Sequence, residues 1–305
     1  MLVHLSPHLG IRQKEAIAGW IFASPWVIGF VVFTAGPMVA SAVFAFTDWN
    51  IVQPMRWVGL QNIQTALMSD PLVWQSLRVT TIYAFVSVPL QIVLGLIVAL
   101  LLNSKIRGLE FYRTIYYLPS VLSGVAVALL WRWIYAPDFG LINSTLASLG
   151  IAGPGWLGDS RWALPSLIGM SLWYVGGGIV VYLAGLQGVP TELYEAAHVD
   201  GAGWWHRLWN VTIPMITPVL FYQLVTGIIG ALQVFTQALI MTEGGPHNAT
   251  LFYMLYLYRN AFQYFKMGYA SLLAWILFFY ILALTFLVLR SSQFWVFYAG
   301  EIREK

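Results

Sequence analysis

Acidic side chains gather in one segment of this sequence, residues 187–213, and they are the first candidates for chemistry. Glu192, Glu195 and Asp200 lie close together there. Two carboxyl groups that face one cleft could act as a general acid and a general base, because each would hold or release a proton in turn. The same charges on an exposed surface would instead contact another protein.

The rest of the sequence offers few groups for catalysis or metal binding. There is no cysteine, which removes disulfides, thiolate metal sites and thiol nucleophiles together. The five histidines form no metal-spaced pair within an apolar stretch, and no glycine is followed by lysine, so the chain carries no phosphate-binding loop. The residues therefore indicate no metal site and no ATP hydrolysis through such a loop, which leaves a transporter driven from outside, a channel, or a membrane enzyme.

The composition of the chain indicates the class of protein to which this segment belongs. The chain is 59% hydrophobic and only 9% charged, whereas soluble domains carry about 25% charged residues. A helix needs about 20 apolar residues to cross a bilayer. Long intervals without Asp, Glu, Lys or Arg predict an all-α polytopic membrane protein with six transmembrane helices, over residues 18–43, 79–103, 114–135, 164–186, 214–241 and 267–289.

The distribution of positive charge predicts the orientation of these spans. Lys and Arg concentrate in the N-terminal segment 1–15, after span two, in the loop 187–213 and in the C-terminal tail 291–305. Cytoplasmic loops carry an excess of these residues, so we expect both termini on the cytoplasmic side of a 16–290 membrane domain. The residues that carry this bias are Arg12, Lys14, Lys105, Arg107, Arg113, Arg207, Arg290, Arg303 and Lys305. The net charge of +3 is too small to suggest a nucleic-acid partner.

Segment 187–213 reads as two short helices joined by a turn. Pro190 suits a first helical position, and Gly201 breaks the helix because glycine accepts backbone angles that other residues avoid. The small residues Ala196, Ala197 and Ala202 would let another backbone approach closely, while four apolar residues could form one face of the second helix: Trp204, Trp205, Leu208 and Trp209. Taken alone, the pattern fits a docking element and a lipid-contacting interfacial helix equally well.

The order of residues in this segment resembles a known family. Glu-Ala-Ala at 195–197, Asp-Gly-Ala at 200–202, and then Val211-Thr212-Ile213-Pro214 and Pro218 are similar to the cytoplasmic loop of the membrane subunits of bacterial ATP-binding-cassette (ABC) importers. The resemblance implies a type I ABC importer permease fold. It also implies that this loop forms coupling helices, in which the residues facing a separate ATPase are Glu195, Ala196, Ala197, Asp200, Gly201 and Ala202.

The resemblance extends over nearly the whole chain. Ser24-Pro25-Trp26 through Phe46-Thr47-Asp48-Trp49, Phe111-Tyr112-Arg113-Thr114, and Met241-Thr242-Glu243-Gly244-Gly245-Pro246 look like carbohydrate permeases of the maltose and glycerol-phosphate type. This similarity implies a bacterial or archaeal cytoplasmic membrane, a second homologous permease subunit, an ATPase dimer that binds ATP and Mg²⁺, and an extracytoplasmic solute-binding protein or lipoprotein. It also implies that this chain itself has no catalytic residue, no metal and no cofactor. The outer connections 49–77, 134–161 and 243–266 are the expected docking surface for that binding protein.

Spans four and five carry polar and aromatic residues at helical spacing, as a sugar pathway requires. The candidates on span four are Ser171, Trp173, Tyr174 and Gly178; those on span five are Gln233, Phe235 and Gln237, and the two glutamines are expected on one helical face. Hydrogen bonding between helices would explain the same residues equally well.

No Lys or Arg lies in the middle of a span, which favours a neutral di- or oligosaccharide such as trehalose or maltose. A glycerol-3-phosphate or other polyol or sugar-phosphate permease of the same family is the alternative solute assignment. A membrane-embedded enzyme or a self-sufficient channel are the alternatives of another class.

Overall fold

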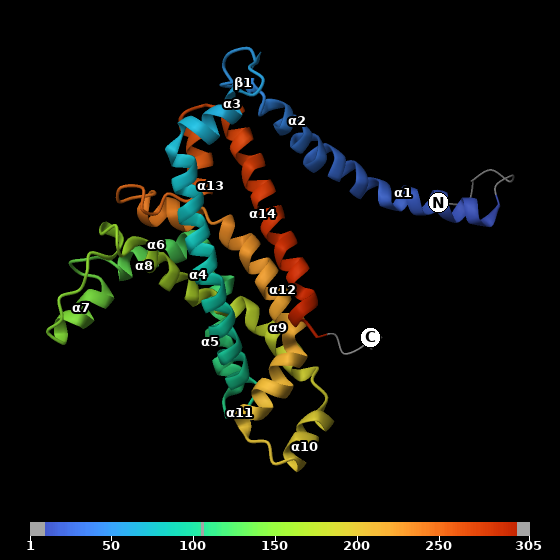
Figure 1. Cartoon of the computed structure of the whole chain (residues 1–305), viewed down its shortest axis with the longest axis vertical. Coiled ribbons are helices and arrows are strands. Elements are labelled where there is room, and N and C mark those ends of the chain that lie inside the picture. The colour runs from blue at the N-terminus through green and yellow to red at the C-terminus, as the bar shows by residue number, and fades with distance from the viewer. Residues whose placement is uncertain (1–9, 105–106, 298–305) are drawn as a thin grey trace. The chain divides into compact units, whose positions relative to one another are not determined.

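A computed structural model describes residues 10–104 and 107–297 of the chain (Figure 1). The chain divides into two compact units, one made of residues 1–67 with 260–275 and the other of residues 68–259 with 276–305. The predicted terminal segments 1–15 and 291–305 lie partly outside the described residues. Lys105, Arg303 and Lys305, on which part of the orientation argument rests, lie outside them entirely.

Helices make up nearly all of the regular structure, as the composition predicts. The elements, where η marks a short 3-10 or π-helical segment, run in this order: α1 Ile11–Phe30, η1 Val31–Ala35, α2 Gly36–Phe44, β1 Thr47–Asp48, β2 Arg56–Trp57, α3 Gln61–Gln64, η2 Thr65–Ser69, α4 Pro71–Leu102, α5 Leu109–Val121, α6 Gly124–Ile134, α7 Leu141–Ser148, η3 Trp156–Gly158, α8 Ala163–Ser171, η4 Leu172–Val175, α9 Gly176–Gln187, α10 Thr191–Val199, α11 Trp204–Arg207, η5 Leu208–Thr212, α12 Ile213–Leu232, η6 Ala238–Thr242, α13 Tyr253–Tyr258, η7 Arg259–Gln263 and α14 Met267–Trp295.

The first unit holds the N-terminal helix and a small hairpin. Elements α1, η1 and α2 form one apolar helix of 34 residues, Ile11–Phe44. Strands β1 and β2 pair antiparallel after it, and the Asn62 side-chain amide donates to the carbonyl oxygens of Ala45 and Thr47 at 2.9 Å each. The Trp275 indole of α14 donates to the Ser41 hydroxyl at 3.2 Å. These bonds satisfy polar groups at the helix end, where the chain turns.

The second unit packs α9 and α12 against α4. Asp70 caps α4 by accepting a hydrogen bond from the Leu72 backbone at 3.0 Å, and Pro71 fills the first position, where its missing N–H costs nothing. Two clusters of buried side chains join the three helices; the first contains Ala99, Tyr182, Leu186, Val189 and Ile216, and the second Val98, Leu102, Ile179 and Leu183. This core lies at the C-terminal end of α4, next to the segment 187–213.

Within the described residues, five helices are long and apolar enough to cross a membrane, and a sixth span arises if α5 and α6 count together. That count agrees with the six predicted spans. The prediction of one continuous third helix over 114–135 is wrong, however, because the chain breaks at Leu122 and Ser123 and α6 turns by 102° from α5. Apolar composition sets the length of a span but does not fix its direction.

The fifth span also differs from the prediction. Its helix runs over Trp204–Leu232 instead of 214–241, so Pro214 and Pro218 lie inside a continuous helix and the second short helix of the loop is its first turn. Residues 233–235 are not helical. Gln233 and Gln237 therefore do not share one face of a continuous helix, and the expectation that they do is wrong.

Smaller differences lie at the helix ends and in one loop. Helix α4 begins at residue 71 instead of 79, α14 continues to residue 295 instead of 289, and α10 begins at Thr191, one residue after Pro190. The outer connection 134–161 contains the short helix α7. Pro89 lies within α4 without ending it.

Candidate functional site

The turn between α10 and α11 closes as a helix C-terminal cap. The Gly201 N–H donates to the His198 carbonyl at 3.0 Å, and the Ala202 N–H donates to the Ala197 carbonyl at 2.9 Å. Gly201 has a φ of +75°, a left-handed conformation that costs a side-chain-bearing residue roughly 1–2 kcal/mol. The predicted break at Gly201 is confirmed, and it is set by backbone geometry.

This turn presents an exposed tip, which we define as residues 195–202 (Figure 1). Glu195, Ala196, Asp200 and Gly201 are exposed, whereas Ala197 and Ala202 are half-buried. Val199 is 86% exposed, although valine is usually buried. The tip thus combines small residues, an apolar side chain and two carboxylates, which suits contact with another protein.

The tip is fixed to the helices of the core. The side chain of Tyr194 packs against the cluster of Ala99, Tyr182 and Ile216, and its hydroxyl lies 3.1 Å from the Thr212 hydroxyl at the start of the fifth span. A displacement of the tip would therefore move the ends of α4, α9 and α12 together. Sequence reasoning missed Tyr194; its signal was an aromatic residue one position before Glu195.

The tryptophans of the predicted apolar face lie beside α4. Trp204, Trp205 and Trp209 line a cavity of about 540 Å³ together with the apolar α4 residues Leu96 and Leu100. Each of these tryptophans is more than half exposed in the single chain. The apolar face predicted for this helix is present.

A second candidate site lies inside the unit, in a cavity of about 210 Å³ that we name the Tyr174 cavity. Its lining residues are Tyr83, Gln91, Leu167, Met170, Ser171, Tyr174, Thr226, Gly227, Gly230, Ala231, Val234 and Gln237. A smaller cavity of about 70 Å³ adjoins it and shares Gln91, Tyr174 and Gly227. The Gln91 amide donates to the Ser171 hydroxyl at 3.0 Å, while the Tyr174 hydroxyl is buried without a hydrogen-bond partner among the described residues.

Two interruptions of spanning helices meet this cavity. In span four the α-helix narrows to a 3-10 segment over Leu172–Val175, and in span five it ends before residues 233–235. Interrupted helices expose backbone polar groups, which membrane proteins tolerate only inside protein or beside a water-filled cavity, and transporters bind solutes at such interruptions. The cavity therefore suits a polar solute.

The structure brings together only part of the predicted pathway. Ser171, Tyr174 and Gln237 line the Tyr174 cavity, and Gly178 lines the smaller cavity, where its carbonyl accepts from Gln223 at 3.1 Å. The other three predicted residues line neither cavity: Trp173, whose ring lies 6.0 Å from that of Trp131; Phe235, whose ring lies 4.9 Å from that of Tyr258; and Gln233, which is exposed.

Three polar residues of the cavity were missed by the sequence analysis, namely Tyr83, Gln91 and Thr226. Gln91 gave a usable signal, since it is an amide within an otherwise apolar span and follows Pro89 closely. Tyr83 and Thr226 resemble ordinary residues of a spanning helix, and only the packing of α4 against α12 places them at the cavity.

Residues 91–296 match the protein family described as "Binding-protein-dependent transport system inner membrane component". The chain is 41% identical to the probable ABC transporter permease protein YesP of Bacillus subtilis, over 95% of this chain and 94% of the relative. It is 36% identical to the lactose transport system permease protein LacF of Rhizobium radiobacter, over 93% and 96%. A crystal structure of a bacterial ABC transporter involved in the import of the acidic polysaccharide alginate contains a chain with a TM-score of 0.81 at 25% identity, over 92% of this chain and 97% of that one.

Proposed function

This chain belongs to the family of binding-protein-dependent transport system inner membrane components, and from that premise we propose that it is the permease subunit of a sugar importer powered by a separate ATPase. The solute passes by alternating access, an equilibrium between inward-open and outward-open states that ligands bias by binding one state better. The observation that carries the proposal is the exposed tip 195–202, whose base is packed into three spanning helices.

The tip is the coupling element in this proposal. The residues that meet the ATPase are Glu195, Ala196, Ala197, Asp200, Gly201 and Ala202. Their mixture of small side chains and carboxylates on a capped turn lets a cleft of the partner close around them. The cytoplasmic location of the tip, and of both termini, follows from the distribution of Lys and Arg.

The Tyr174 cavity forms part of the solute pathway in this proposal. Among the described residues that line it, none is charged, which supports a neutral sugar over a phosphorylated one. Its volume of about 210 Å³ is below the roughly 300–1,000 Å³ of typical ligand sites. The missing part of the site would come from a second, homologous permease subunit.

Within this proposal the solute is a di- or oligosaccharide such as trehalose, maltose or lactose. The lactose permease name of one relative supports a disaccharide. An extracytoplasmic binding protein delivers the sugar to the connections 49–77, 134–161 and 243–266.

Cross-linking from the tip tests the coupling role. The chain has no cysteine, so Ala196→Cys creates a single attachment point without a competing thiol. We expect a short thiol-reactive cross-linker to capture the ATPase subunit in membranes that express the whole transporter. Ser148→Cys, on the α7 connection, is the matched control and should not capture it. Equal capture by both variants, or by neither, would exclude the proposed contact.

Sugar uptake tests the pathway. Gln91→Leu removes the hydrogen bond to Ser171 and the only amide that α4 offers to the Tyr174 cavity among the described residues. We expect uptake to fall at least about fivefold, since an unpaired polar solute group costs roughly 1–3 kcal/mol, while ATP hydrolysis without solute is unchanged. Thr81→Val, which removes a hydrogen bond between α4 and Tyr280 outside the cavity, should transport normally. Normal uptake by Gln91→Leu would refute the assignment.

A further inference from the structure

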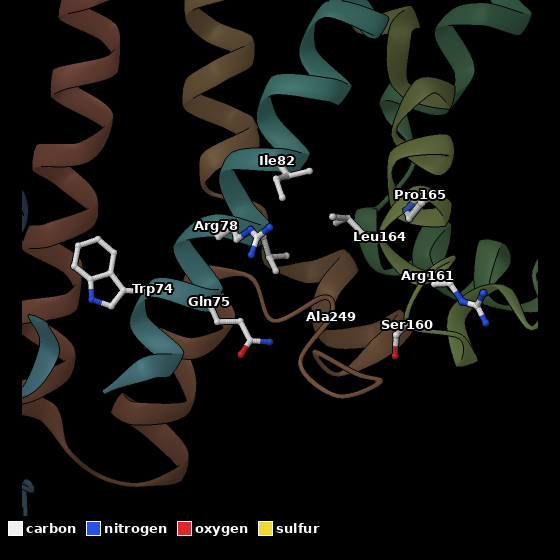
Figure 2. A pocket seen from close by; sticks show the side chains of 10 residues that line it. Trp74, Gln75, Arg78, Ile82, Ser160, Arg161, Leu164, Pro165 and Ala249 are labelled. Carbon is white, nitrogen blue, oxygen red and sulfur yellow. The ribbon is translucent and has the colours of Figure 1, made fainter. Parts of the chain in front are cut away.

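A separate cavity of about 580 Å³ lies between the first turns of α4 and the start of α8 (Figure 2). Its lining residues are Trp74, Gln75, Arg78, Val79, Ile82, Ser160, Arg161, Leu164, Pro165 and Ala249. The volume falls within the roughly 300–1,000 Å³ of ligand sites. None of these residues belongs to the tip or to the Tyr174 cavity, and five of them lie in the connections at which the binding protein is expected to dock.

The cavity has an apolar part and a polar edge. Val79 and Ile82 follow Arg78 on α4. Leu164 and Pro165 lie in the first turn of α8, just after Arg161, which precedes that helix. On both sides of the cavity the apolar residues therefore lie further along the span than the arginine. Such an arrangement matches a ligand with an anionic head and an apolar body.

The side chain of Arg78 is exposed and has no counterion in the described part of the chain. No hydrogen bond or ion pair joins its guanidinium to any residue within 10–104 or 107–297. In Figure 2 its side chain projects from α4 toward the gap that Leu164 enters from α8, whereas Arg161 points away from it. Arg161 lies 3.8 Å from Asp159 and is 90% exposed, so that carboxylate does not neutralise Arg78.

The position of Arg78 points to a membrane ligand. It directly precedes the long apolar run of α4, where the helix meets the bilayer surface, and the half-exposed Trp74 lies one turn before it. Tryptophan near a helix end marks the membrane interface, and an arginine near a helix end places its charged group there. Basic pockets between spanning helices bind lipid head groups on the cytoplasmic side of membranes, and the same charge attraction acts on an anionic lipid of either leaflet. A water-soluble partner could pair with Arg78, but it would not fill the apolar part at Ile82 and Leu164.

We propose that this cavity binds an anionic glycerophospholipid, with the phosphate beside Arg78 and an acyl chain along Val79, Ile82 and Leu164. The lipid fills the groove between α4 and α8 and neutralises the arginine. The assignment of this lipid to the outer leaflet rests on the proposed function, because that function places the N-terminal end of α4 on the outer side of the membrane.

Native mass spectrometry of the full-length chain in its transporter complex tests the proposal. The probes are palmitoyl-oleoyl phosphatidylglycerol, phosphatidylcholine with the same acyl chains, and inorganic phosphate. We expect phosphatidylglycerol to be preferred over phosphatidylcholine by about fivefold, which corresponds to ~1 kcal/mol for one arginine at a membrane surface. Arg78→Gln should remove this preference. Arg290→Gln, which removes an exposed arginine at the far end of α14, should keep it.

A second variant and a second readout make the outcome decisive. Leu164→Trp should fill the apolar part and weaken both lipids alike. An unchanged preference in Arg78→Gln would overturn the proposal, as would displacement of the lipid by an equal concentration of inorganic phosphate. Loss of binding-protein-stimulated ATP hydrolysis in Arg78→Gln with lipid preference intact would assign Arg78 to protein docking instead. Because wild-type ATP hydrolysis is measured on the same samples, failure of the lipid site is distinguishable from failure of the importer proposal.

Discussion

The left-handed turn at Gly201 offers the sharpest test of coupling. A β-carbon at this position would have no heavy atom within 4 Å, so a substitution creates no steric clash with the rest of the chain. Within the chain the strain comes from the backbone, because a φ of +75° disfavours every residue with a side chain and β-branched residues most. A valine side chain would also face the ATPase, and Gly201→Asn, whose side chain is of similar size, controls for that contact. We therefore choose Gly201→Val.

The expected magnitude follows from that strain. A left-handed residue other than glycine costs roughly 1–2 kcal/mol, which lowers the population of the native turn by a factor of about 5–30 relative to competing conformations. The tip would then present its residues in the wrong geometry to the ATPase. We expect solute-stimulated ATP hydrolysis to fall by up to the same factor, while hydrolysis by the isolated ATPase is unchanged.

Gly150 supplies a matched control. It also has a φ of +75° with nothing within 4 Å of an added β-carbon, and it ends α7 with the same pair of hydrogen bonds, from Gly150 to Ala147 and from Ile151 to Leu146. Gly150→Val therefore carries equal strain outside the tip. Because Gly150 lies in the connection 134–161, where the binding protein is expected to dock, its readouts are assembly with the ATPase and the melting temperature, which should both match those of Gly201→Val. Gly201→Asn should retain most of the activity, because asparagine tolerates this conformation.

The assay is ATP hydrolysis by the reconstituted transporter, with and without the sugar-loaded binding protein. Wild-type stimulation in Gly201→Val, with normal assembly, would refute the coupling role of the turn. A lower melting temperature or poorer assembly in Gly201→Val than in Gly150→Val would show that the loss comes from general instability and not from the geometry of the tip.

Two further predictions concern packing. Gly176→Ala would place a β-carbon 1.7 Å from the carbonyl oxygen of Tyr116, so we expect a loss of stability at or above the roughly 1–3 kcal/mol of overpacked cores. The control Gly177→Ala, whose added β-carbon has its nearest neighbour at 3.6 Å, should melt like the wild type. Equal melting temperatures for the two variants would contradict the close helix packing. Tyr194→Phe removes the hydrogen bond to Thr212. We expect the transporter to lose about 0.5–1.5 kcal/mol of stability and part of its stimulated ATP hydrolysis. Full stimulation of hydrolysis would show that this hydrogen bond does not fix the tip.

Patterns in the local sequence were sufficient to predict the spans and the turn at Gly201. The absence of charge over long intervals predicted the number of spans, because each must lie in hydrocarbon whatever its neighbours are. The capped turn at Gly201 was predictable because its geometry depends on residues only a few positions apart.

The interruptions of the spanning helices became visible only in the tertiary structure. The bend between α5 and α6, the 3-10 segment at Leu172–Val175 and the break at residues 233–235 all lie within intervals that contain no Asp, Glu, Lys or Arg. A break in a membrane is stable only where neighbouring helices or a cavity satisfy the freed backbone groups. That condition depends on residues far away in the chain, so local sequence does not reveal it.

Sequence by itself determined the membrane class, the number of spans and the tip at 195–202, because hydropathy and turn chemistry act over short stretches of chain. The tertiary structure alone decided which polar side chains share a cavity. Gln91 and Ser171 are 80 residues apart and become hydrogen-bonded partners only when α4 packs against the fourth span, whereas the closely spaced Gln233 and Gln237 are separated by a break in the helix. Proximity in a folded chain is set by packing between helices, and a single sequence records the faces of each helix but not which faces meet.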